Sequence, residues 1–312
     1  MTKKAAYRTF LHSFLSLLAV SLSLCSVLFL SQDASRGALK GLVLCAGTVI
    51  PSVFPYMVLG DFVSSFLLSN GLGIIELVFS LPLKLSQTGG AIGLSGLLCG
   101  FPTAARISAE EYRRGSITKN EAIRTAALFS NPSPSFIIGA VGAGLFSSKK
   151  LGALLFISLL LSIYTVGILY RSGALKEDKG SPSLKHCFNF ISSVRSAATA
   201  SVTVFAFITF FRAGIEVLSS LIGRGAIFSS LLPFIEISSA AEWLSCSSIT
   251  PLFLYLSLGF SVGFGGICAN FQCAAFLSDA GLPVRNFFAL KLLLGAVCSI
   301  FSTLFLGLLP LI

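Results

Sequence analysis

The stretch that decides the fold reads GGAIGLSGLLCGFPTAAR over residues 89–106, and a second one reads FSNPSPSFIIGAVGAGLF over residues 129–146. Each is an apolar run interrupted by proline together with glycine or asparagine. Proline has no backbone N–H to donate and clashes with the preceding turn, so we predict that both helices break. Free backbone groups at membrane depth are tolerated only inside protein or beside a water-filled cavity. The two breaks therefore predict one half of a binding site.

The composition is that of a polytopic membrane protein. Apolar residues make up 54% of the chain, charged residues 11%, and the mean hydropathy is +0.91. Soluble domains carry about a quarter charged residues. The net charge of +10 is explained by Lys and Arg in cytoplasmic loops, and no basic patch interleaved with aromatic residues predicts nucleic-acid binding. Eight scattered cysteines form no C-x-x-C pair, so we expect neither a metal nor disulfides. We also expect no cofactor.

The second half of the chain repeats this plan. Residues 226–244 form an apolar run interrupted at Pro233 and again at residues 236–239, and residues 251–277 form one interrupted at residues 263–266. Matching interruptions in two halves are the best sequence indication of a transporter site. We therefore predict an all-α polytopic membrane protein built as an inverted repeat, with three crossings and one re-entrant hairpin in each half, preceded by an N-terminal helix.

The predicted segments are an N-terminal transmembrane anchor over residues 1–37, a first Gate-type repeat over 38–170, a cytoplasmic linker over 171–190 and a second, inverted repeat over 191–312. This arrangement assigns 16 of the 22 Lys and Arg residues to the inside, Lys291 among them, and 6 to the outside, including Arg212 and Arg224. The bias follows the positive-inside rule and predicts a cytoplasmic N-terminus. Two local features are also predicted: an interfacial segment over residues 72–85, and a helix start at Thr118 with Glu121 completing a capping box.

Broken helices offer charge for binding, because half-helix N-termini attract anions and unwound carbonyls attract cations. The interruptions add small polar side chains. A single Ser in a membrane helix often bonds only its own backbone, but the four interruptions together favour a site. The candidate substrate-binding residues are Gly100, Phe101, Pro102, Thr103, Arg106, Asn131, Ser133, Ser135, Glu236, Ser238, Ser239, Gly265, Gly266, Asn270 and Gln272.

Glu236 is the most informative single residue. A charge at mid-bilayer costs about 2.5–3.5 kcal/mol on insertion scales, and such residues mark ion or substrate paths. Three roles stay open for it: binding a coupling cation, carrying a proton, or forming a structural ion pair with Arg212 or Arg224. Arg106 is either an attractant for an anionic substrate or an anchor on the inside face, and Asp61 is expected at the membrane interface. No metalloprotease, P-loop or nucleophile–His–acid pattern occurs, so we expect no enzyme.

Several motifs resemble the sporulation integral membrane protein family called YlbJ or SpoVV. They are GFPTAAR over residues 100–106, NPSP over 131–134 with FIIGAVG after it, Glu236-Ile237, and Gly265-Gly266 with Gln272. The resemblance covers most of the chain from about residue 41. It implies a Gate domain related to concentrative nucleoside transporters, and a place in the outer forespore membrane. It also implies that the protein passes dipicolinate, a small aromatic dianion, from the mother cell toward the forespore.

The chain departs from this family at the predicted site. The family tends to have Asn-Asn-Ser-Gly-Pro where residues 130–134 read SNPSP, Asn-Gly where Ser239-Ala240 stands, and His in place of Asn270. The substrate therefore stays open between dipicolinate and a nucleoside or another small solute, and a non-transporting assembly factor of sporulation is a further alternative. The expected partners are a small anionic substrate, a coupling ion of unknown identity, the lipid bilayer and, as an open alternative, further copies of the chain.

Overall fold

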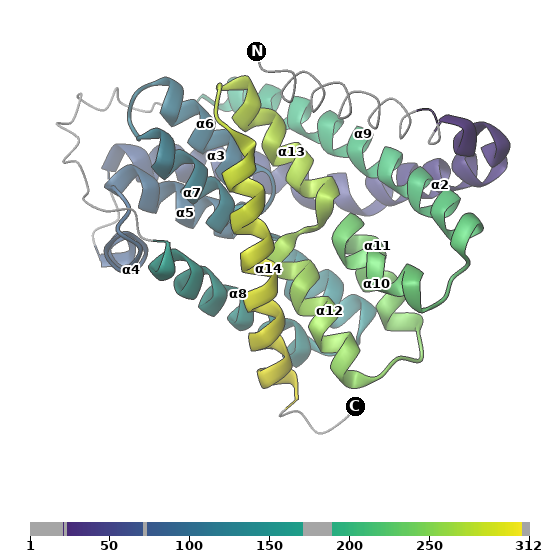
Figure 1. Ribbon diagram of the computed structural model, residues 1–312. Coiled ribbons are helices and arrows are strands. Elements are labelled where there is room, and N and C mark those ends of the chain that lie inside the picture. The colour runs from purple at the N-terminus through teal and green to yellow at the C-terminus, as the bar shows by residue number, and fades with distance from the viewer. Residues whose placement is uncertain (1–20, 22–23, 71–73, 171–188, 308–312) are drawn as a thin grey trace, which may run out of the picture.

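The computed structural model describes residues 21, 24–70, 74–170 and 189–307, and these residues form helices and no strand (Figure 1). Within this part, four segments are long and apolar enough to cross a membrane. They are α8 (Lys149–Leu169), α9 (Phe190–Ile222), the pair α12 (Pro251–Phe264) and α13 (Gly266–Asp279), and α14 (Val284–Leu306). The predicted all-α class is confirmed. The predicted N-terminal helix and the linker lie largely outside the described residues.

A long helical segment precedes the first hairpin. Helix α2 (Ser31–Leu44), the π-helical segment η1 (Cys45–Val49) and α3 (Ile50–Asn70) follow one another without a loop. Helix α2 continues without a break through residues 37 and 38, where the sequence predicts the boundary between the anchor and the first repeat. Pro51 removes one backbone donor just after η1, and π turns are a usual adjustment of membrane helices to such a loss.

The first predicted hairpin is present, and its turn is set by one glycine. Helix α4 (Ile74–Leu83) leads into α5 (Gln87–Cys99), which packs against α6 (Thr103–Arg113). Gly100 ends α5 with a φ of +78°, a conformation that glycine adopts without steric cost. The apolar run therefore turns back at residues 100–102, where the sequence places the tip.

Helix α7 (Lys119–Phe129) begins as predicted at Thr118, whose hydroxyl accepts a hydrogen bond from the Glu121 N–H at 3.3 Å. The Glu121 carboxylate accepts from the Ser86 N–H at 2.6 Å. It therefore joins the start of α7 to the residue that caps α5, in place of the local reciprocal bond of a capping box. Helix α7 ends before the predicted break, and the π-helical segment η2 (Ser135–Leu145) follows it.

The second half contains a matching hairpin and broken helix. Helices α10 (Ala226–Ile235) and α11 (Ile237–Cys246) meet at Glu236, and α12 and α13 meet at Gly265. The predicted interruption at Pro233 is wrong, since this residue lies inside α10. It falls in the last turn of that helix, where its missing N–H removes the helical hydrogen bond to the Ser229 carbonyl, and α10 continues for only two more residues to Ile235.

Helices from both halves interleave in the assembled protein (Figure 1). Helix α2 packs along α9, α14 packs against α7, α8 and α12, and α13 packs against α6 and α9. Gly37 and Gly41 permit the close approach of α2 to α9: a Cβ on Gly41 would lie 2.8 Å from Thr209 Cα. Small residues four positions apart are a usual device for such packing in membranes. This interleaving brings interruptions from the two halves together.

Candidate functional site

The interruptions of the two halves touch one another at glycine positions. A Cβ on Gly100 would lie 2.9 Å from the backbone nitrogen of Ser133, in the first helix break. A Cβ on Gly265, in the second break, would lie 2.3 Å from the ring of Phe101. The tip of the first hairpin therefore lies against both breaks. Any side chain larger than hydrogen at these two glycines would push the segments apart.

The second hairpin joins the same cluster through Glu236. A Cβ on Gly266 would lie 3.1 Å from Glu236 Cα. The buried Glu236 carboxylate caps α11, because it accepts hydrogen bonds from the N–H groups of Ser238 at 2.8 Å and Ser239 at 2.7 Å, and from the Ser239 hydroxyl at 2.6 Å. It thereby satisfies backbone donors that a helix start leaves free.

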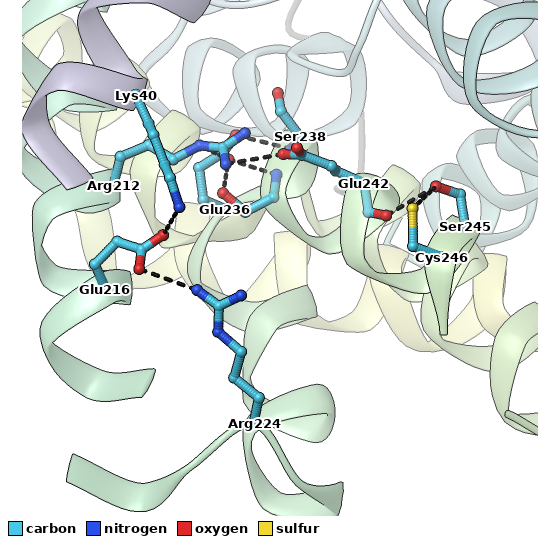
Figure 2. Close-up of polar contacts among 10 residues, drawn as sticks. Lys40, Arg212, Glu216, Arg224, Glu236, Ser238, Glu242, Ser245 and Cys246 are labelled. Atoms are coloured by element: carbon cyan, nitrogen blue, oxygen red, sulfur yellow. Dashed lines mark hydrogen bonds and ion pairs between the residues drawn. The ribbon is translucent and has the colours of Figure 1, made fainter. Parts of the chain in front are cut away.

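A network of charges surrounds this cap (Figure 2). The Arg212 guanidinium lies 3.8 Å from the Glu236 carboxylate and 2.9 Å from that of Glu242. Arg224 pairs with Glu216 at 3.0 Å, and Lys40 pairs with the other oxygen of Glu216 at 2.6 Å. Of the two ion pairs that the sequence leaves open for Glu236, the structure contains the one with Arg212.

A lysine that the sequence analysis placed at the inside edge lies at the centre of the breaks. Lys291 is fully buried in α14. Its Nζ donates to the carbonyl oxygen of Ser130 at 2.8 Å, to Asn131 Oδ1 at 2.8 Å and to the carbonyl oxygen of Gly263 at 2.9 Å. It also lies 5.3 Å from the centre of the Phe101 ring, within the range of a cation–π contact. We call Lys291 with its three oxygen acceptors the lysine cradle.

Each break also holds a buried asparagine that bonds the helix before it. Asn131 Nδ2 donates to the carbonyl oxygen of Leu128 at 2.6 Å, at the end of α7. Asn270 Nδ2 donates to the carbonyl oxygen of Phe264 at 2.8 Å, at the end of α12. Asn270 Oδ1 has no hydrogen-bond partner among the described residues, although the residue is fully buried. A buried acceptor of this kind is costly unless a water molecule or ligand reaches it.

Arg106 forms a second polar group beside the first hairpin. Its guanidinium pairs with Asp61 of α3 and donates to the Ser196 hydroxyl of α9 at 3.3 Å. Asp61 therefore has a partner within the protein and lies in the middle of α3, and its interfacial position stays a prediction. These residues border a cavity of about 10 Å³, with room for about one water molecule. The residues lining this Arg106 pocket are Met57, Asp61, Pro102, Thr103, Arg106, Ser196, Ala197 and Ala200.

The chain is similar to the "Sporulation integral membrane protein YlbJ" of Bacillus subtilis (strain 168), with 26% identity over 316 aligned residues. The match covers 88% of this chain and 78% of the relative. This match supports the resemblance of the chain to the YlbJ family. No protein-family model matches the chain, and no solved structure gives a significant match. Together with the four apolar segments, the match identifies an integral membrane protein.

Three of the predicted residues form side-chain hydrogen bonds that are local and do not join the two breaks. Ser133 and Ser135 bond each other through their hydroxyls at 2.9 Å, and Ser133 also accepts from the Phe136 N–H at 3.3 Å. Gln272 donates to the sulfur of Cys268 at 3.7 Å. The two serines therefore serve the start of η2, and Gln272 bonds within its own helix α13.

Two residues of the candidate site were not predicted from the sequence, and both had a sequence signal. Lys291 is a charge inside an apolar run that spans α14, and charges within membrane segments mark functional positions by default. Its nearness to the predicted start of the run placed it at the membrane edge instead. Asp61 is an acid inside the apolar run of α3, but nothing in the sequence indicates Arg106 as its partner.

Proposed function

We propose that this protein is a transporter of a small organic anion that works by alternating access at its broken helices. The observation that carries the proposal is the meeting of all four interruptions in one place, joined by Gly100, Phe101, Gly265 and Gly266. Non-helical backbone at membrane depth is tolerated where it is buried in protein or lines a cavity. Paired interruptions of this kind form the substrate sites of many transporters.

The charges at the first hairpin favour an anion as the substrate. Helix α6 begins at Thr103 without a side-chain cap, and α13 begins at Gly266 without one. Uncapped helix starts leave N–H groups and partial positive charge available to an anion. Arg106 adds a full positive charge three residues after Thr103. The second hairpin differs, because Glu236 already supplies an anion to the start of α11.

In this structure the Arg106 pocket is a closed form of the proposed site, since it is too small for the substrate. Its 10 Å³ cannot hold an aromatic dianion. Entry of such a substrate requires the first hairpin to move away from α3 and α9, and the Asp61–Arg106 pair to separate. The substrate carboxylates would then replace Asp61 as partners of Arg106. Alternating access needs a conformational change of this kind.

Both halves contain the parts that an inverted repeat requires. Each has a hairpin, a broken helix with a buried asparagine, and a following apolar helix: α5, α6, α7, η2 and α8 in the first half, and α10 to α14 in the second. We propose that the halves are related in this way and have opposite orientations in the bilayer. The resemblance to the YlbJ family supports dipicolinate as the first candidate substrate and the outer forespore membrane as the location.

The test is uptake of labelled dipicolinate by proteoliposomes that contain the purified protein. We expect uptake by the wild type, and strong loss of uptake with normal insertion in Glu236→Gln and Asn131→Ala. Ser230→Ala is the control, since the Ser230 hydroxyl donates to the Ala226 carbonyl of its own helix and lies outside the candidate site. Competition with unlabelled uridine and with benzoate separates a nucleoside carrier from an anion carrier. Absence of uptake, or full uptake in both site variants, would refute the proposed site.

A further inference from the structure

Lys291 differs from the buried carboxylates of the described chain, which lie near arginines, and resembles Arg124, whose guanidinium donates to the backbone carbonyls of Leu83 and Lys84. Glu111 lies near Arg114 at 2.8 Å, and Glu236 lies near Arg212 at 3.8 Å. Within the described part, the hydrogen-bond partners of the Lys291 ammonium are uncharged oxygens. A buried ammonium without a carboxylate is expensive, so the surrounding oxygens must themselves favour a cation.

The source of this preference is the way two helices end. Helix α7 ends at Phe129 and α12 ends at Phe264, and the carbonyl groups of Ser130 and Gly263 lie beside these ends. The C-terminus of a helix carries about half a negative charge, spread over its unpaired carbonyls. Two such ends converge on one point between the halves of the chain. A cation placed there neutralises both.

Asn131 completes the arrangement with a side-chain oxygen. Its Nδ2 donates to the Leu128 carbonyl at 2.6 Å, which directs Oδ1 toward Lys291 at 2.8 Å. An ammonium group has three donors and no acceptor, and the cradle provides three oxygens at 2.8 to 2.9 Å. Every N–H of the ammonium is therefore used inside the protein, and none is left for an anionic substrate.

We propose that the carbonyl oxygens of Ser130 and Gly263, together with Asn131 Oδ1, form a monovalent-cation site that the Lys291 ammonium occupies permanently. Unwound carbonyls and helix C-termini coordinate coupling cations in other transporters. Here the cation is part of the chain. The consequence for ion coupling rests on the proposed function. Transport of the anion requires no Na⁺ at the breaks, because the Lys291 ammonium already joins them.

The direct test replaces the ammonium by one supplied in solution. Lys291→Ala removes the cation and leaves space at the cradle, whereas Lys291→Met removes the charge but fills most of that space. We expect Tm of Lys291→Ala in detergent to rise by several degrees when choline chloride is replaced by ammonium or methylammonium chloride at equal ionic strength. Wild type and Lys291→Met should show no such difference. Equal melting of a folded Lys291→Ala in all of these salts would overturn the proposal.

A second measurement on the wild type covers the case in which Lys291→Ala does not fold. Tm of the wild type should be the same in sodium chloride and choline chloride, since the site is already filled. Uptake by wild-type proteoliposomes should likewise be unchanged when external Na⁺ is replaced by choline. Stabilisation by Na⁺, or uptake that requires it, would overturn the proposal. Failure of uptake in every salt, with ammonium rescue of Lys291→Ala intact, would refute the proposed function alone.

Discussion

The Nζ of Lys291 lies 2.8 Å from Oδ1 of Asn131, and this bond joins a helix of the second half to the break of the first. Both residues are fully buried. The same ammonium bonds the carbonyl of Gly263 in the second break. The position of one break relative to the other is therefore set by one side chain, and changes at Asn131 should weaken the contact between the halves.

Asn131→Ala should lower the free energy of unfolding by about 1–3 kcal/mol, because a buried donor of Lys291 loses its acceptor. Asn131→Asp should be less destabilised than Asn131→Ala, since its carboxylate still accepts from the ammonium and adds opposite charge. Denaturation of the purified variants in detergent, followed by circular dichroism, measures both. Equal stability of Asn131→Ala and the wild type would mean that the bond contributes nothing to the junction.

Gly265→Ala should destabilise the protein by about 1–3 kcal/mol, the usual cost of a strained backbone conformation in a residue other than glycine. Gly265 has a φ of +85°, and the added Cβ would meet the Phe101 ring at 2.3 Å. Thermal melting measures the loss. The matched control is Gly214→Ala in α9, where an added Cβ has no neighbour within 4 Å and should be neutral or stabilising.

The two causes of this loss can be separated with Phe101. Adding Phe101→Ala to Gly265→Ala removes the clash but leaves the backbone strain, so the double variant should lose less than the sum of the two single variants. Residues in contact show non-additivity of about 0.5–3 kcal/mol. Strict additivity would mean that the ring moves aside without cost and that the hairpin tip is not fixed against Gly265.

The places where the helices break could be predicted because proline and glycine act locally. The sequence 100–102 ends one helix, the sequence 130–134 ends another, and Gly265 ends a third, whatever surrounds them. Pro233 shows the limit of this reasoning. Its missing N–H removes one hydrogen bond from the last turn of α10, but the helix continues to Ile235, so a proline does not always end a helix where it stands.

The partners of the charges could not be predicted, because they depend on long-range packing. Asp61 and Arg106 lie on different helices, and Lys291 on α14 meets Asn131 in the first break, which is far from it in the sequence. The sequence places a charge within an apolar run but does not say whether the neighbouring helix supplies a carboxylate or a set of carbonyls. Glu236 was the exception: its bonds to Ser238 and Ser239 are local, and the pairing with Arg212 was one of two alternatives.

Variants of Asp61 and Arg106 should affect anion affinity in opposite directions. Under the proposed function, Asp61 competes with the substrate for the Arg106 guanidinium. Asp61→Asn should therefore lower KM for dipicolinate, and Arg106→Gln should raise KM several-fold, whereas Arg106→Lys should lie between Arg106→Gln and the wild type. Uptake at varied substrate concentration measures each value. A purely structural ion pair would give reduced uptake in Asp61→Asn and Arg106→Gln alike.

Trp243 should report movement of the second hairpin, since it is the single tryptophan of the chain. Its Nε1 on α11 donates to the Ser229 hydroxyl on α10 at 2.8 Å, and Arg224 lies 5.9 Å from its ring. If access alternates between the two sides, this hairpin shifts relative to α9 and the surroundings of the indole change. Saturating dipicolinate should therefore change the intensity or wavelength of tryptophan emission.

Two controls make this fluorescence prediction specific. Trp243→Phe should remove the signal while leaving uptake close to that of the wild type. The Trp243 ring packs edge-on against Phe228 at a centroid distance of 5.3 Å, and a phenyl ring at this position retains an aromatic contact there. Arg106→Gln should retain the tryptophan but need a higher dipicolinate concentration for the same change. An emission spectrum that stays constant at substrate concentrations that saturate uptake would mean that the second hairpin is fixed during transport, and the moving part would then be the first hairpin alone.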